Sequence, residues 1–190
     1  MTASGNPEDL ALLREDLAYH QARILLLVDA VAAVHGHQGK VDGLTKLAKL
    51  DFLLRYPAFA PVVLDALSPA DPRLGIDEEE TVDPGNVEAP MIRYRYGPWD
   101  DRYYAVIGAL VSRNLLRYVR GRRGSVALTP TPDGRAFATQ LAAARQWSEI
   151  AERSKAIAES SAGLTGNALK TLIYQRLGSL MDREFGEVIR

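Results

Sequence analysis

A segment rich in proline and glycine, from Ser68 to Pro90, separates two parts of the chain that each carry helical patterns. Proline cannot donate a backbone hydrogen bond and glycine favours turns, so this segment excludes any long helix or strand. Between Asp65 and Glu88, eight acidic residues accompany a single base, Arg73, which gives a local charge of −7. We therefore expect a solvated acidic loop, residues 68–90, between two largely helical halves.

The N-terminal half, residues 1–67, predicts three helices. Apolar residues at helical spacing indicate a first helix from Pro7 to His35, and because Ile24–Val28 is apolar on all sides, we expect its second half to be enclosed. Glycines then end this helix, and a second helix spans Leu44–Tyr56, followed by a short third helix over Ala58–Leu67. Two helices joined by a glycine-containing turn are typical of a helix-turn-helix, and also of many other all-α proteins.

The sequence after the acidic loop predicts the element order of a winged-helix module, residues 91–145. Alternating residues indicate an extended segment at Met91–Tyr96, and helical spacing follows over Trp99–Arg113. Two β-type runs, Leu115–Val119 and Ser125–Thr129, flank a loop of glycine and arginine, which predicts a hairpin that we call the wing. Thr131–Gly134 is expected to cap a further helix that begins near Arg135 and continues to about Ala158.

The C-terminal helical tail, residues 146–190, ends with an apolar pattern over Leu164–Arg190 that predicts an amphipathic helix of about six turns. Its apolar face either docks a partner or packs against the first helix, and the sequence leaves both alternatives open. The predicted fold class is mainly α. It combines a helix-turn-helix-like N-terminal half, a winged-helix module with a short β-hairpin, and long C-terminal helices.

Arginines cluster in and before the wing. Eight arginines and two aspartates occur between Met91 and Gly124, a local charge of +6, although the whole chain has a net charge of −1. Guanidinium groups interleaved with tyrosines favour contact with a phosphate backbone. The alternative is that Arg93 and Arg95 neutralise the acidic loop while the tyrosines pack under the wing. The candidate nucleic-acid-binding residues are Arg93, Arg95, Arg117, Arg120, Arg122 and Arg123.

The sequence does not predict a metal or cofactor site. No cysteine occurs, which excludes disulfides, thiolate nucleophiles and cysteine-ligated metal centres. His35 and His37 have only Asp42 close in sequence as a further ligand, so a structural role at a helix end is favoured. Gly39-Lys40 is followed by Val41 where a phosphate loop needs Ser or Thr, and this excludes a nucleotide site of that kind.

Nothing in the sequence indicates catalysis. The paired carboxylates Asp100-Asp101 and the run Glu78–Glu80 lie near no catalytic histidine or nucleophile motif. We expect the Asp pair in the first turn of the helix after Pro98, where carboxylates offset free N–H groups. The protein is therefore predicted not to be an enzyme.

The sequence predicts a cytoplasmic protein with no membrane partner. Its apolar runs, such as Ile24–Val28, are much shorter than the about 20 residues that a bilayer span needs. The polar residues Met1–Asn6 do not predict a secretion signal.

Two stretches of the chain carry a resemblance to a known family. The stretch Lys49–Pro57 reads K-L-D-F-L-L-R-Y-P, and Tyr96–Trp99 reads Y-G-P-W. Together with Leu25–Val34 before them and the wing after them, they resemble the middle components of bacterial ABC-three-component systems. The resemblance covers about residues 20–140, and nothing after Arg145 contributes to it.

The resemblance implies a non-catalytic adaptor subunit in anti-phage or anti-plasmid defence of the Lamassu type. Its partners would be a coiled-coil ATPase of the SMC/Rad50 kind and an effector subunit, with DNA as a further contact that involves no sequence reading. The matching positions Lys49, Asp51, Arg55, Tyr96 and Trp99 become structural or interface candidates. The candidate partner-binding residues, including three from the tail, are Lys49, Arg55, Trp99, Leu172, Ile173 and Leu177.

A second functional class is a freestanding winged-helix DNA-binding transcriptional regulator. Such a regulator usually presents a basic helix to the major groove. Asp100 and Asp101 stand where the helix Trp99–Arg113 would begin its contacts, and their acidity counts against direct readout.

Overall fold

The computed structural model describes residues 17–77, 81–85 and 90–189, and it confirms a mainly α fold with a short β-hairpin. The helices of this part are α2 (Leu17–Ala33), α3 (Leu44–Arg55), α4 (Ala60–Val63), α6 (Tyr103–Ser112), α7 (Pro132–Ala143), α8 (Arg145–Ser160), α9 (Gly166–Arg176) and α10 (Gly178–Met181). The strands are β1 (Val41–Asp42), β2 (Ile92–Tyr94), β3 (Gly97–Trp99), β4 (Leu116–Arg120) and β5 (Val126–Pro130). Short 3₁₀ turns occupy His35–His37, Pro57–Phe59, Pro72–Leu74 and Arg122–Gly124.

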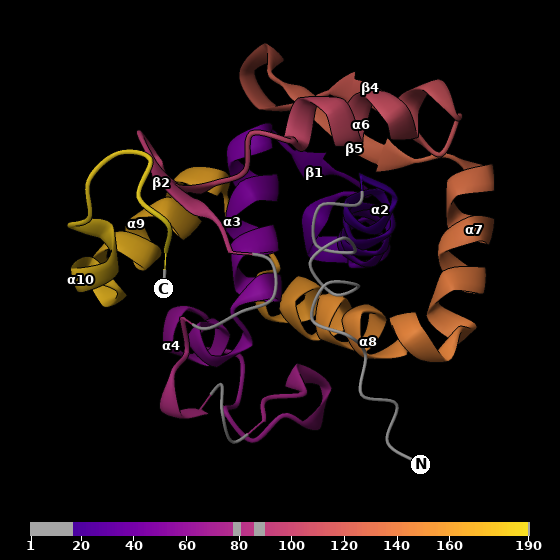
Figure 1. Cartoon of the computed structure of the whole chain (residues 1–190). Helices are drawn as coiled ribbons and strands as arrows, with labels where there is room; N and C mark the ends of the chain where they lie inside the picture. The colour runs from indigo at the N-terminus through magenta and orange to yellow at the C-terminus, as the bar shows by residue number, and fades with distance from the viewer. Residues whose placement is uncertain (1–16, 78–80, 86–89, 190) are drawn as a thin grey trace.

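Helix α2 lies in the centre of the molecule, surrounded by α3, α6, α7, α8 and the wing strands (Figure 1). The run Ile24–Val28 is buried on every side, as its apolar composition predicts. The helix ends at Ala33, two residues before the expected His35. The part of the expected first helix that precedes Leu17 lies outside the described residues.

Strand β1 joins the N-terminal half to the wing. The wing strands β4 and β5 pair in antiparallel register from Leu116 opposite Pro130 to Arg120 opposite Val126. On its other edge, β5 pairs with β1, so the sheet has the order β1-β5-β4. Sequence reasoning treats residues 41–42 as a connection, because two residues are too short to show strand alternation. The shared sheet unites the expected segments 1–67 and 91–145 in one structural unit.

The residues Gly97–Trp99 form a strand instead of a turn followed by a helix. They pair with Ile92–Tyr94 to form a second small hairpin, and Gly97 adopts a φ of +99° that favours glycine. Helix α6 therefore begins at Tyr103, four residues later than predicted. Asp100 and Asp101 precede the helix, which corrects their expected position in its first turn.

The C-terminal helices are shorter than the sequence predicts. Thr131 caps α7 by accepting a hydrogen bond from Gly134 N, but the extended backbone at Ala144 separates α7 from α8. The expected six-turn tail helix is α9 followed by the short α10. The chain then returns to β2, where Val188 forms a bridge with Ile92. The expected third helix, residues 58–67, is a 3₁₀ turn followed by the single turn of α4.

One apolar core includes residues from all the helical segments, from Ile24 in α2 to Ile189 near the C-terminus. Helix α9 of the tail packs on α3 and α4, whereas α8, which precedes it, packs on α2. Leu169 and Ile173 of α9 are fully buried in this contact. The four expected segments therefore do not have separate cores.

Candidate functional site

A buried carboxylate on α3 organises the polar interior of the protein. Asp51 is fully buried and accepts hydrogen bonds from Arg23 Nε at 2.8 Å and from Arg55 Nη2 at 2.7 Å. The hydroxyl of Tyr103, the first residue of α6, donates to the same carboxylate at 2.7 Å. His20 approaches the guanidinium of Arg23 with its Nδ1 at 2.6 Å. Asp51 thus ties α3 to α2 and α6.

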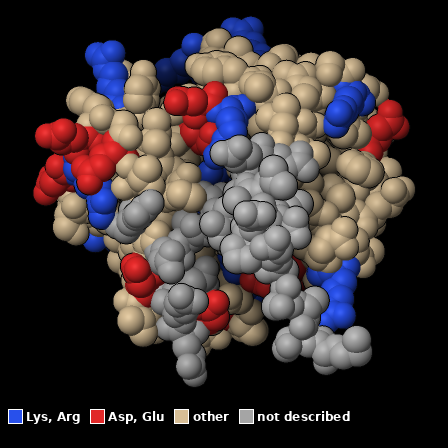
Figure 2. All heavy atoms as spheres, viewed as in Figure 1, with Lys and Arg blue, Asp and Glu red and all other residues tan. Residues whose placement is uncertain are grey.

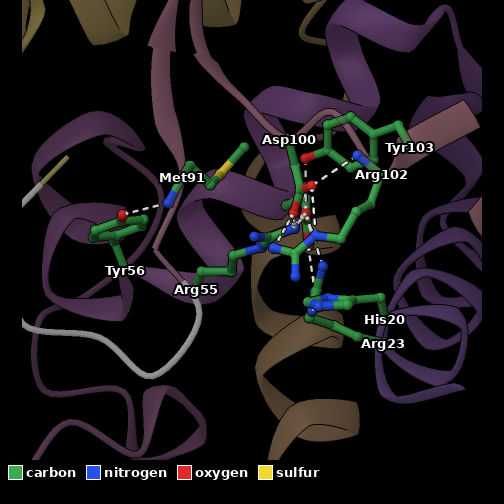
Figure 3. Close-up of polar contacts among 9 residues, drawn as sticks. His20, Arg23, Arg55, Tyr56, Met91, Asp100, Arg102 and Tyr103 are labelled. Carbon is green, nitrogen blue, oxygen red and sulfur yellow. Dashed lines mark hydrogen bonds and ion pairs between the residues drawn. The ribbon is translucent and has the colours of Figure 1, made fainter. Parts of the chain in front are cut away.

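Arg55 connects this carboxylate to a second one at the junction between β3 and α6. Its Nη2 donates to Asp100 at 2.7 Å as well as to Asp51. Asp100 also accepts from the backbone N and the Nε of Arg102, each at 2.9 Å. Figure 3 shows the side chains of α2, α3 and the β3–α6 junction converging on these carboxylates. We call Arg23, Asp51, Arg55, Asp100 and Tyr103 the ion network.

The ion network is charged in the folded protein. Burial by itself raises the pKa of Asp51, but the guanidinium groups of Arg23 and Arg55 outweigh it and hold that pKa far below its usual value. Burial likewise opposes ionisation of Asp100, and the bonds from Arg102 and Arg55 lower its pKa. Burial and the neighbouring carboxylate of Asp51 raise the pKa of Tyr103 well above its ordinary value, which keeps the phenol a hydrogen-bond donor.

The two stretches that carry the family resemblance meet in space. Lys49 is buried and donates to the carbonyl of Pro98 at 3.2 Å, and Arg55 reaches Asp100. Burial, followed by the positive charges of Lys170 and Arg93, lowers the pKa of Lys49 to about 7. Tyr56, the next residue after Arg55, accepts a bond from Met91 N and donates to the carbonyl of Ile189. Both stretches therefore hold the β2–β3 hairpin on α3.

An exposed aromatic cluster lies on this hairpin and on the first turn of α6. Tyr94, Tyr96 and Tyr104 are 48%, 50% and 71% exposed. The ring of Trp99 lies 6.0 Å from that of Tyr94 and 6.3 Å from that of Tyr104. The guanidinium of Arg95 stands over the Tyr96 ring. We call Tyr94, Arg95, Tyr96, Trp99 and Tyr104 the hairpin surface. Exposed aromatic and arginine side chains on a rigid support are typical of protein-binding sites.

The candidate arginines separate into two groups. Arg117, Arg120, Arg122 and Arg123 are exposed on the wing, where the backbone N of Arg122 donates to Asp42 at 2.9 Å. On the face that Figure 2 shows, basic side chains are scattered among uncharged and acidic ones.

The other two arginines lie away from the wing. Arg93 donates to the carbonyls of Met181 and Tyr94 and stands over the rings of Tyr174 and Phe185. Arg93 therefore holds the C-terminal segment against β2. Within the described residues of that loop, Asp71 pairs with Arg73, and the preceding Asp65 pairs with Arg176.

Most of the candidate partner-binding residues are inside the protein. Lys49, Arg55, Ile173 and Leu177 are buried, so their contacts are with the chain's own core. Leu172 is half-buried, and Trp99 is half-buried within the hairpin surface. The structure thus favours the structural alternative for the buried four. The docking face expected on the tail helix is used for packing on α3 and α4.

Sequence reasoning misses the ion network, although one signal for it is present. Asp51 falls between Leu47 and Leu54 on the apolar side of α3, where a lone carboxylate is costly to bury. Arg55, four residues later, is the expected helical partner. Nothing in the sequence indicates that Arg23 and Tyr103 reach the same carboxylate. His37 bonds to Lys46 and to the carbonyl of Ala158, and the described residues contain no cluster that would hold a metal ion.

No protein-family model matches the chain, and neither the curated proteins nor the solved structures include a significantly similar one. Among the described helices, none has the length and apolar character to cross a bilayer.

Proposed function

We propose that the protein is a non-catalytic adaptor subunit built on a winged-helix unit, and that the hairpin surface binds its partner. The order α2, β1, α3, α6, β4, β5 with a β1-β5-β4 sheet supports a winged-helix unit that carries the β2–β3 hairpin as an insertion. From the family resemblance, the partner is a coiled-coil ATPase of the SMC/Rad50 kind that acts with an effector subunit in defence.

The observation that carries this proposal is the combination of the hairpin surface with the ion network beneath it. Three exposed tyrosines would be poor stabilisers of the fold, whereas rigid aromatic side chains supply binding energy at little entropic cost. The network fixes the β3–α6 junction from which Trp99 and Tyr104 project. Such preorganisation favours a binding role.

Affinity purification from the native host with mass spectrometry tests the proposal. We expect a coiled-coil ATPase to copurify with the wild-type protein and to be lost from the double variant Tyr96→Ser/Tyr104→Ser. Tyr118→Ser is the matched control, because Tyr118 is an equally exposed tyrosine that lies on the wing. Absence of the ATPase from the wild-type sample, with recovery of one specific promoter instead, would reverse the ranking in favour of the regulator.

A second candidate function is DNA-backbone contact through the wing. The exposed arginines at 117, 120, 122 and 123 favour it, whereas the exposed residues of α6 between Tyr104 and Ser112 are small and uncharged, as Ala105 and Gly108 illustrate. A helix with that surface lacks the side chains that read base edges. This candidate therefore predicts affinity without sequence preference.

The wing variant Arg120→Ala/Arg122→Ala/Arg123→Ala tests the second candidate by DNA binding at several salt concentrations. We expect weaker binding to every sequence and a shallower salt dependence, by up to about one slope unit for each lost phosphate contact. Arg145→Ala, an exposed arginine on α8, is the control. Unchanged binding in the triple variant would exclude the wing.

A further inference from the structure

A small basic pocket lies where the wing meets the first turns of α3 and α9. Its volume is about 40 Å³, and its lining includes Lys40, Lys46, Arg122 and Asp42 together with the segment 163–166. Three of these side chains are cationic and one is anionic, so the lining carries a net charge of +2. The basic lining of this pocket is unrelated to a phosphate loop, whose motif the sequence lacks.

The one carboxylate of the pocket is already engaged. Asp42 accepts hydrogen bonds from the backbone N of Arg122 at 2.9 Å and from the hydroxyl of Ser125 at 3.1 Å, and Arg122 Nε stands 3.7 Å away. Lys40 donates to the carbonyl of Arg120 at 3.0 Å. These bonds hold the backbone of the wing loop at the pocket, and the Arg122 side chain lines it.

Lys46 is a buried cation without a carboxylate partner among the described residues. It is 5% exposed, and its ammonium donates to His37 Nδ1 at 2.9 Å. The other ring nitrogen of His37 faces the carbonyl of Ala158 at 2.8 Å, which assigns the proton to Nε2 in a neutral ring. Burial lowers the pKa of Lys46 to about 8 despite the charge of Asp42, with Arg122 lowering it further. An anion in the pocket would relieve this cost.

Two helix N-termini add positive potential at the same place. A Cβ atom at Gly166, the first residue of α9, would lie 2.9 Å from the backbone N of Lys46 in the first turn of α3. The first N–H groups of a helix lack intrahelical partners, and each N-terminus carries about half a positive charge. Bringing two such ends together is unfavourable unless negative charge lies nearby. Glycine at 166 is what permits the approach.

We propose that this pocket binds a terminal phosphate group. The pocket is small, so it would hold the phosphate group while the remainder of the ligand lies outside. Lys46 and Arg122 would contact the phosphate oxygens, with the N-terminus of α9 adding backbone donors. The ligand is either a small phosphorylated molecule or the phosphorylated end of a nucleic acid, and the site does not depend on the adaptor role.

Isothermal titration calorimetry with inorganic phosphate at constant ionic strength tests the site, with chloride as the reference ion. We expect binding to the wild-type protein and about tenfold or greater weakening in Lys46→Gln and in Arg122→Gln. Arg123→Gln is the matched control, because Arg123 is the adjacent wing arginine but does not line the pocket. We expect its affinity to remain within about twofold of wild type.

No phosphate-specific binding by the wild-type protein overturns the proposal. Equal weakening in Arg122→Gln and Arg123→Gln also overturns it, because it would show a diffuse attraction to the wing. If Lys46→Gln does not fold, Arg122→Gln decides the matter, since the Arg122 side chain is 63% exposed and its loss leaves the core intact.

A second arm of the experiment identifies the source of the phosphate. A 5′-phosphorylated oligonucleotide is compared with the same oligonucleotide bearing a 5′-hydroxyl. Tighter binding of the phosphorylated form, abolished in Arg122→Gln, assigns a nucleic-acid end. Equal binding of the two, with inorganic phosphate still bound, assigns a small phosphorylated molecule. If the protein binds phosphate but does not copurify with an ATPase, the phosphate site is supported and the proposed adaptor role is rejected.

Discussion

Asp51 is the central residue of the ion network. Its carboxylate accepts from Arg23, Arg55 and Tyr103, all of them buried. Replacing it with alanine leaves two guanidinium groups without their main counter-charge inside the protein. We expect Asp51→Ala to reduce the free energy of unfolding by about 3–5 kcal/mol, measured by chemical denaturation.

Asp101→Ala is the control for this prediction. Asp101 is exposed and precedes α6, the helix whose first residue, Tyr103, contacts Asp51, so its loss should change the free energy of unfolding by less than about 0.5 kcal/mol. Equal effects of the two substitutions would contradict a special role for Asp51.

Lys49 makes stability depend on pH. Its pKa is lowered from 10.5 in the unfolded chain to about 7 in the folded protein, chiefly by burial. Between these two values the unfolded chain binds more protons than the folded protein, so the free energy of unfolding rises with pH. Lys49 therefore destabilises the folded protein most at pH 7 and below, and this cost shrinks as pH rises towards 10.5. We expect Lys49→Met to be more stable than wild type at pH 6–7, with the difference narrowing towards pH 9.

Denaturation curves at several pH values between 6 and 9 check the Lys49 prediction. Lys155→Met on α8 is the control, because Lys155 is half exposed and pairs with Glu152. A Lys49→Met difference that stays constant across this range would show that the ammonium does not lose its proton on folding.

At the scale of the elements, close backbone approaches position α7 against the wing. A Cβ atom at Gly134 would lie 1.9 Å from the carbonyl oxygen of Leu115, just before β4. This oxygen is part of the backbone and already accepts from Thr131 N, so it cannot move freely. We expect Gly134→Ala to lower the free energy of unfolding by about 1–3 kcal/mol, measured by thermal or chemical denaturation.

Gly108 on α6 offers the opposite case. A Cβ atom there meets nothing within 4 Å, and the residue has an ordinary helical conformation. Gly108→Ala should therefore stabilise the protein by about 0.5–1 kcal/mol, since alanine is the better helix former. If both glycine substitutions destabilised to the same extent, steric contact at Gly134 would not be the cause.

At the scale of the whole molecule, the tail is part of the core. Leu169 and Ile173 are fully buried on α3 and α4, and Ile189 accepts a hydrogen bond from Tyr56. A variant that ends at Gly163 exposes these contacts and removes the chain that Arg93 holds. We expect it to aggregate or to melt without a cooperative transition in circular dichroism.

The same truncation separates two roles of the tail. A truncated protein that remained folded and soluble but lost its partner would show that the tail is a docking helix. Destabilisation on removal would show that it completes the fold. The burial of its apolar face predicts the second outcome.

Sequence periodicity by itself determined the elements whose reasons are local. The enclosed stretch Ile24–Val28, the α3 helix ending before Pro57, the wing hairpin and the Thr131 cap all follow from side-chain spacing and turn chemistry. The signals that predict these features lie within a few positions of one another in the sequence, so they can be recognised without the fold.

Only the tertiary structure decided the features that depend on long-range contacts. Residues 41–42 form strand β1 because they pair with the edge of β5 opposite β4. Likewise, Gly97–Trp99 forms a strand because it pairs with Ile92–Tyr94. The ion network and the basic pocket join side chains from distant segments. A pairing strand or a counter-charge that lies far away in the sequence produces no periodic pattern. Such sites therefore cannot be predicted from spacing, and they form only when the chain folds.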